Sequence, residues 1–134
     1  MNSIKKTAEK MDTKVLLSTL WIVVMINMAY ADIISLHIPG LLEELAIFAG
    51  ETPITQLMLI GAIMLEIPIA MIFLSRVLKY KVNRWANIIA SVITIAYVVG
   101  GGLLYPHYLF IATIEVVCML LIAWNAWKWT NPEG

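Results

Sequence analysis

The sequence predicts an all-α membrane protein, a four-transmembrane-helix bundle with a short interfacial helix between spans one and two. Two observations support this fold class. Of the 134 residues, 61% are hydrophobic and 13% are charged, whereas soluble domains have about 45–50% apolar and about 25% charged residues. The apolar residues also occur in blocks of about 20, the length that a helix needs to cross a bilayer. The lipid bilayer is therefore the expected environment of most of the chain.

The apolar blocks divide the chain into a polar leader (residues 1–13), a four-helix membrane domain (14–129) and a short tail (130–134). The first block has an alternative interpretation as a secretory signal peptide, because the Ala-Tyr-Ala run at 29–31 is similar to a cleavage site. Its apolar stretch is longer than that of a signal peptide and contains Asn27, so a membrane span is favoured. The predicted spans are residues 15–36, 53–75, 85–104 and 108–127.

A short helix and a direction across the membrane are also predicted. Pro39 and Gly40 end the first span, and apolar residues then recur at helical spacing over residues 41–48. So short a segment cannot cross a bilayer, and it is expected to lie at the interface. All nine Lys and Arg residues lie in or beside the leader, in the second loop or at the C-terminal end. Because basic loops stay in the cytoplasm, both termini are predicted to be cytoplasmic in the cell membrane.

Composition and motifs exclude several functional classes. The formal net charge is zero, so the chain lacks the basic field on which nucleic-acid binding depends. Its single cysteine, Cys118, cannot form an internal disulfide or a cysteine-based zinc site. No dinucleotide, P-loop or haem motif occurs, and His37 and His107 lack the spacing of a metal-binding pair. The sequence therefore predicts no cofactor, no metal site, no catalytic residue and no nucleic-acid partner.

Three acidic residues interrupt the apolar blocks, namely Asp32, Glu66 and Glu115. Each costs at least about 2.5–3.5 kcal/mol near the bilayer centre, and such residues usually face a bundle interior and serve a function. At about 1.5 Å per residue, Asp32 lies about 6 Å, Glu115 about 10–12 Å and Glu66 about 20 Å below the outer boundary. We expect them to line one internal pocket that opens outward. Alternatively, each is a neutral acid that only links helices through hydrogen bonds.

Each span has a seam of small or polar residues that is expected to face the bundle interior. In the second span this seam contains Glu66, flanked at i ± 4 by Ala62 and Ala70. In the fourth span Tyr108 and Glu115 share a face with the cysteine. The third seam is the most regular and consists of Asn87, Ser91, Thr94, Val98 and Gly101. The candidate ligand-binding or proton-coupling residues are Asp32, Glu66, Glu115, Asn27, Asn87, Thr94 and Tyr30, although for Asn27 a helix-linking hydrogen bond is the favoured alternative.

Several segments together resemble a bacterial and archaeal family of small four-span proteins that is catalogued as a domain of unknown function. The resemblance extends from Met11 to Trp129 and implies four helices, but it carries no activity. A looser similarity, in size and four-helix layout, is to the DoxX-like group, some members of which associate with quinone-linked oxidation. No residue motif transfers a site from that group. The segments that carry the family resemblance are residues 16–21, 27–32, 66–71, 75–76, 83–87 and 123–127, together with Glu115.

The leading functional prediction is binding of a proton, a cation or a small polar or cationic solute, with translocation as its extension. Glu66 would be the coupling acid, Asp32 would lie near the entrance and Glu115 between them. Four spans form a thin wall for a pore, so a homodimer or another membrane partner is expected. One alternative is an auxiliary or scaffold subunit of a membrane complex. The other is a small membrane enzyme acting on a lipid or quinone, with carboxyl groups as general acid and base, and this is the less favoured one.

Overall fold

The computed structural model describes residues 12–100 and 105–130, and every regular element in these ranges is a helix. Four helices are long and apolar enough to cross a membrane, so the predicted all-helical class is confirmed and the described residues contain four candidate spans. The predictions for residues 1–11, 101–104 and 131–134, including most of the leader and the tail, lie outside the described residues. The helices are α2 (Thr13–Ser35), α3 (Leu41–Ala49), α4 (Ile54–Val77), α5 (Tyr80–Gly100) and α6 (Pro106–Lys128).

The helix bounds follow the apolar blocks closely, with one clear difference at α5. This helix begins at Tyr80 rather than at Trp85, because the charged residues Lys81 and Arg84 continue the helix instead of forming a loop. Only residues 78 and 79 separate α4 from α5. The short helix α3 is present where it was predicted, between Gly40 (φ 82°) and Gly50 (φ 61°). Both turns use a left-handed backbone that glycine adopts without steric cost.

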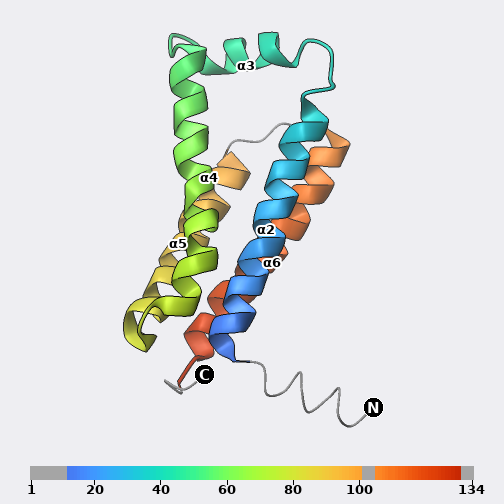
Figure 1. Ribbon diagram of the computed structural model, residues 1–134. Helices are drawn as coiled ribbons and strands as arrows, with labels where there is room; N and C mark the ends of the chain where they lie inside the picture. Colours follow the sequence, from blue (N-terminus) through green and yellow to red (C-terminus); the bar gives the residue numbers. More distant parts are fainter. Residues whose placement is uncertain (1–11, 101–104, 131–134) are drawn as a thin grey trace.

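The four long helices form a ring in the order α2, α4, α5, α6. Helix α2 packs against α4 and α6, and α5 packs against the same two helices from the other side. Figure 1 shows α3 lying across one end of the bundle, with the start of α2 and the end of α6 at the opposite end. We call these the α3 end and the basic end, since Arg76, Arg84 and Lys128 all lie near the second of them.

The half of the bundle near the basic end is filled by a buried polar network. The Nε1 of Trp21 donates to the Oδ1 of Asn87 at 2.7 Å, and Ser75 Oγ donates to the same oxygen at 3.2 Å. The amide nitrogen of Asn87 donates in turn to Asn83 Oδ1 at 2.7 Å. These side chains are fully buried, and they join α2, α4 and α5. The polar seam that was predicted for the third span therefore does face the interior, at Asn87, Ser91, Thr94 and Val98.

One arginine side chain, that of Arg84, joins α5 to the end of α6. Arg84 donates from Nε to the carbonyl of Ala126 at 3.0 Å and from Nη2 to that of Trp127 at 2.8 Å. Its guanidinium also lies 5.8 Å from the ring of Trp85 and 5.5 Å from that of Trp127. The last carbonyls of α6 have no partner within their own helix, so this arginine both satisfies them and places positive charge at the negative end of the helix dipole.

Candidate functional site

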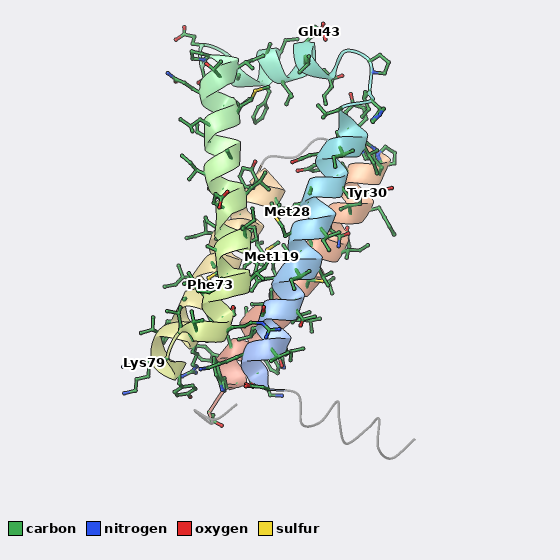
Figure 2. The ribbon with its side chains drawn as sticks, in the orientation of Figure 1. Met28, Tyr30, Glu43, Phe73, Lys79 and Met119 are labelled. Carbon is green, nitrogen blue, oxygen red and sulfur yellow. The ribbon has the colours of Figure 1, made fainter. Side chains whose placement is uncertain are left out.

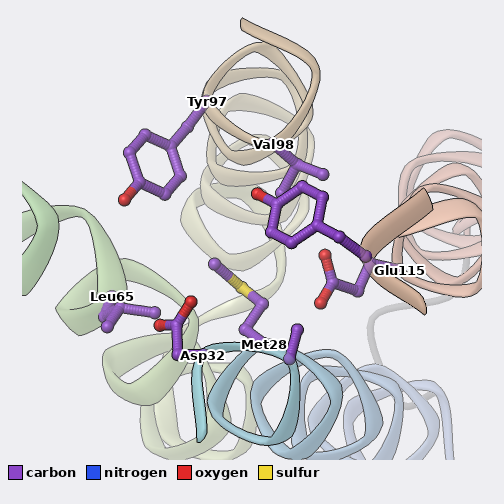
Figure 3. Close-up of a pocket in the computed structure, with 8 residues that line it drawn as sticks. Met28, Asp32, Leu65, Tyr97, Val98 and Glu115 are labelled. Atoms are coloured by element: carbon purple, nitrogen blue, oxygen red, sulfur yellow. The ribbon is translucent and has the colours of Figure 1, made fainter. Parts of the chain in front are cut away.

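The opposite half of the bundle, toward α3, contains a cavity of about 30 Å³ between the four long helices. Such a volume is enough for about one water-sized guest. Figure 3 shows the cavity from close up, with the carboxyl group of Asp32 beside Leu65 and that of Glu115 on the other side of Met28. The lining residues are Met28, Ala31, Asp32, Leu65, Tyr97, Val98, Tyr108 and Glu115.

Helical spacing explains how these side chains come to share one cavity. Met28 and Asp32 are one turn apart on α2, and Tyr108 and Glu115 are two turns apart on α6, so each pair lies on one helix face. Because α2 and α6 are neighbours in the ring, the two faces meet. The structure thus places two of the three acids that interrupt the apolar blocks, Asp32 and Glu115, on the wall of one cavity.

Glu115 is the more enclosed of the two acids, with only 4% of its surface exposed. Asp32 is open on its side toward α4. Within the described ranges neither carboxyl group forms a side-chain hydrogen bond, and no Lys or Arg lines the cavity. Two neighbouring carboxylates repel each other, and burial leaves that of Glu115 poorly solvated, whereas Asp32 is exposed. A proton or a small cation between them would offset both costs, and this is the chemistry that the cavity offers.

A second and larger hollow, which we call the chamber, adjoins the cavity and has a volume of about 390 Å³. The two spaces share Asp32, Leu65 and Tyr97. The hydroxyl of Tyr97 points toward α4 and lies 3.5 Å from where a Cβ on Gly61 would be, which is ordinary van der Waals contact. Apart from Asp32, Ser35 and Tyr97, the chamber is lined by apolar or small residues, namely Leu36, Leu41, Leu45, Leu57, Met58, Gly61, Ala62 and Leu65.

The third acid, Glu66, does not belong to this site, and the prediction that it faces the interior is wrong. Its side chain is exposed, whereas Pro68, two residues further along α4, is buried. Residues two apart point to opposite sides of a helix, so the packing of Pro68 turns Glu66 outward. Ala62 and Ala70, which were expected to let a neighbouring helix approach inside the bundle, are exposed as well.

Helix α4 is the most peripheral of the four. Only 11% of its most apolar window is buried, against 28–33% for the other three long helices. Its outward face carries large apolar side chains such as Phe73, which is 66% exposed (Figure 2). Glu66 therefore sits in the middle of an apolar surface, and within the described residues its carboxyl group has no hydrogen-bond partner.

The remaining candidate residues do not line the cavity either. Asn27 donates to the carbonyl of Val23 in its own helix at 2.8 Å, and Tyr30 is 59% exposed (Figure 2). Asn87 belongs to the hydrogen-bonded network near the basic end. Thr94 is buried, and its hydroxyl has no partner among the described residues. All of them are polar residues in apolar blocks. Polarity alone does not reveal the direction in which a side chain points.

Two tyrosines of the cavity, Tyr97 and Tyr108, were not among the candidate residues. Tyr108 shares a face with Glu115, but a tyrosine at the start of a predicted span is also typical of an interfacial anchor, so its position alone does not indicate a site. For Tyr97 the only signal is a phenol inside an apolar span. Such a group needs a polar neighbour when it is buried, and this could have directed attention to it.

The fold defines the class of the protein as a small helical protein with four candidate membrane spans. A family model described as a family of unknown function (DUF6326) matches residues 4–133, and the chain belongs to this family. The match agrees with the resemblance seen in the sequence. It does not bear on the looser similarity to the DoxX-like group, which stays a prediction. No curated protein and no solved structure is significantly similar to the chain.

Proposed function

We propose that this protein resides in the cell membrane and binds a small cation, a proton or an ammonium group, in the cavity between Asp32 and Glu115. The supporting observation is that Glu115 is 4% exposed, lines a cavity and has no hydrogen-bond partner among the described residues. Buried polar groups in proteins are nearly always partnered, so an unpartnered carboxyl group in a water-sized cavity favours a bound guest. The intramembrane position of the acid favours the same interpretation.

The arrangement supports binding at the α3 end more directly than passage across the bundle. By the positive-inside rule, the basic end faces the cytoplasm and the cavity lies in the outer half. A solute that continued inward would meet the buried network of Trp21, Ser75 and Asn87. Translocation would therefore require those hydrogen bonds to open. In Figure 3, Met28 lies between the two acids, so a guest that touches both must displace its flexible side chain.

The test of the proposal is equilibrium dialysis of radiolabelled methylammonium against the purified protein in maltoside micelles. Asp32→Asn and Glu115→Gln should each lower the affinity by about tenfold or more, because a charge-assisted contact contributes roughly 1.5–3 kcal/mol. Glu43→Gln is the matched control, since Glu43 is an exposed acid on α3 that does not line the cavity. If the native protein binds no methylammonium, a cation or ammonium guest is contradicted and a proton alone is left. If all three variants bind methylammonium as the native protein does, the site between Asp32 and Glu115 is wrong.

The outward position of Glu66 supports a second proposal, association with another membrane protein through α4. A carboxyl group facing lipid near the middle of the bilayer costs several kcal/mol, which a partner can reduce by hydrogen bonding or by a charge. We propose that the partner is a second copy, because Ala62 and Ala70 on either side of Glu66 let two α4 helices approach closely. A pair of carboxyl groups that shares a proton is self-complementary across a two-fold axis.

Light-scattering mass measurement in detergent tests this association. The native protein should be dimeric, and Glu66→Leu should shift it toward the monomer. Thr113→Leu is a control at an exposed polar site on α6, where the hydroxyl bonds only to the carbonyl of Leu109 in its own helix. A native protein that stays monomeric as its concentration rises would contradict the dimer, and the scaffold interpretation with a basic partner helix would then be favoured.

A further inference from the structure

The chamber beside the cavity has the chemistry of a site for an amphiphile. Its volume of about 390 Å³ falls in the range of small-molecule pockets, roughly 300–1,000 Å³. Three segments supply most of its apolar wall: Leu36 directly after α2, Leu41 and Leu45 from α3, and Leu57 and Met58 from α4. An apolar wall of this kind accepts a hydrocarbon chain and gives no ligands to a bare inorganic ion.

Two of the three polar residues of the chamber lie where it meets the cavity, and the third, Ser35, lines the chamber alone. Asp32 and Tyr97 line both spaces, and Glu115 lies immediately beyond them in the cavity. No Lys or Arg lines either space. A fatty acid or another anion would therefore meet only negative charge, and a neutral lipid would leave both acids unpaired. An ammonium group would pair with them, since it combines a positive charge with hydrogen-bond donors.

From this arrangement we propose that the natural ligand is an amphiphilic amine, with its ammonium group at Asp32 and Glu115 and its hydrocarbon part in the chamber under α3. The proposal rests on the proposed cation site and specifies its ligand class. It assigns a role to α3, whose Leu41 and Leu45 line the chamber. It also explains why Asp32, unlike Glu115, is open toward α4, because the carboxyl group borders the space that holds the hydrocarbon part.

The chain offers a matched pair of substitutions to test the chamber. Ala62 and Ala70, two turns apart on α4, are both exposed and both flank Glu66, but only Ala62 lines the chamber. Ala62→Leu and Ala70→Leu therefore add the same atoms to the proposed contact between two α4 helices, and only Ala62→Leu should also fill part of the chamber. Leu45→Phe is a second filling variant, placed on the helix that does not span the membrane.

The experiment measures binding of radiolabelled octylammonium and methylammonium to the protein in phosphatidylcholine nanodiscs, with protein-free nanodiscs subtracted. Phosphatidylcholine is chosen because it has no primary ammonium group. We expect octylammonium to bind about tenfold or more tightly than methylammonium, since apolar burial favours the longer chain. Ala62→Leu and Leu45→Phe should lower the affinity for octylammonium by about tenfold, because the added atoms overpack the chamber. The affinity for methylammonium should stay within about twofold of the native value. Ala70→Leu should change neither, and Asp32→Asn should weaken both.

Two other results separate the inference from the function on which it rests. If methylammonium binding depends on Asp32 but octylammonium binds no more tightly, or if Ala62→Leu and Ala70→Leu behave alike, the cation site stands and the amphiphile is wrong. If Asp32→Asn changes the binding of neither amine, the cation site is wrong and the inference falls with it.

Discussion

The indole N–H of Trp21 in α2 donates a 2.7 Å hydrogen bond to the side-chain oxygen of Asn87 in α5, and both residues are fully buried. The two helices face each other across the ring, so this bond crosses the centre of the bundle. Between this hydrogen bond and the basic end, the buried side chains of Ser75, Asn83 and Asn87 are hydrogen-bonded to one another. Toward the α3 end, Asp32 and Glu115 line a cavity without side-chain hydrogen bonds among the described residues. The hydrogen-bonded polar side chains and the two cavity acids thus lie in opposite halves of the bundle.

Asn87→Ala tests the hydrogen-bonded half. The substitution leaves the donors of Trp21 and Ser75 without their shared acceptor, and a buried unpaired donor costs about 1–3 kcal/mol. We expect a loss of about 1–2 kcal/mol in the free energy of unfolding, measured by SDS titration in mixed micelles. Asn125→Ala is the control, because its amide bonds only within its own helix to Leu121, and its effect should stay within about 0.5 kcal/mol. Equal losses in both variants would contradict a stabilising network.

Thr94→Val distinguishes packing from ligand binding at a candidate residue. The hydroxyl of Thr94 is buried and has no partner among the described residues, so replacing it with a methyl group of similar size removes an unpaired polar atom. The free energy of unfolding should rise by about 1 kcal/mol. Methylammonium affinity should not change, because Thr94 does not line the cavity. A variant that is less stable and also binds more weakly would show that the hydroxyl takes part in the site.

Arg84→Lys keeps the charge but removes the planar fork that reaches the carbonyls of Ala126 and Trp127. We expect a loss of about 1–2 kcal/mol in unfolding free energy, since a hydrogen bond to a charged group contributes roughly that much. The matched control is Lys81→Arg, a charge-conserving change at an exposed site on the same helix. The account of the α6 terminus would be wrong if the two substitutions had the same small effect.

The α3 end should lose stability at high pH. Tyr105 donates from its hydroxyl to Glu44 on α3 at 2.8 Å, and this hydrogen bond to the carboxylate raises the pKa of Tyr105 above its usual value of 10.0. A raised folded-state pKa gives stability that is fully present below about pH 10 and is lost as the pH rises through the folded value. The melting temperature should therefore fall more steeply above about pH 10 in the native protein than in Tyr105→Phe. If the melting temperatures of the two proteins fell in parallel as the pH rises, the hydrogen bond between Tyr105 and Glu44 would contribute nothing to stability.

The sequence allowed the elements to be predicted, because the length and hydropathy of a span are properties of one segment at a time. Its polar seams also predicted the inward face of α5, where Asn87 and Ser91 recur one turn apart and are buried. The same reasoning failed for α4. A carboxylate between two small residues is equally compatible with a bundle interior and with a surface that contacts another chain, so Glu66 could not be oriented from its neighbours alone.

The composition of the cavity could not be predicted for a related reason. Asp32 and Glu115 were found because charges inside apolar blocks are conspicuous, but their meeting depends on α2 and α6 being adjacent, which no segment encodes by itself. Tyr97 joins them only because α5 closes the ring. The chamber depends further on the position of α3, set by its two glycine turns and its packing on α4.

The most direct test of the central claim is infrared difference spectroscopy of the carboxyl groups on adding methylammonium, comparing the native protein with Glu115→Gln. If a cation binds between Asp32 and Glu115, the carboxyl bands of the native protein should change on addition. A distinct part of that change should be missing from Glu115→Gln, while Glu43→Gln should reproduce the native difference spectrum. A native protein whose carboxyl bands do not respond, or a Glu115→Gln variant with the full native response, would contradict the account.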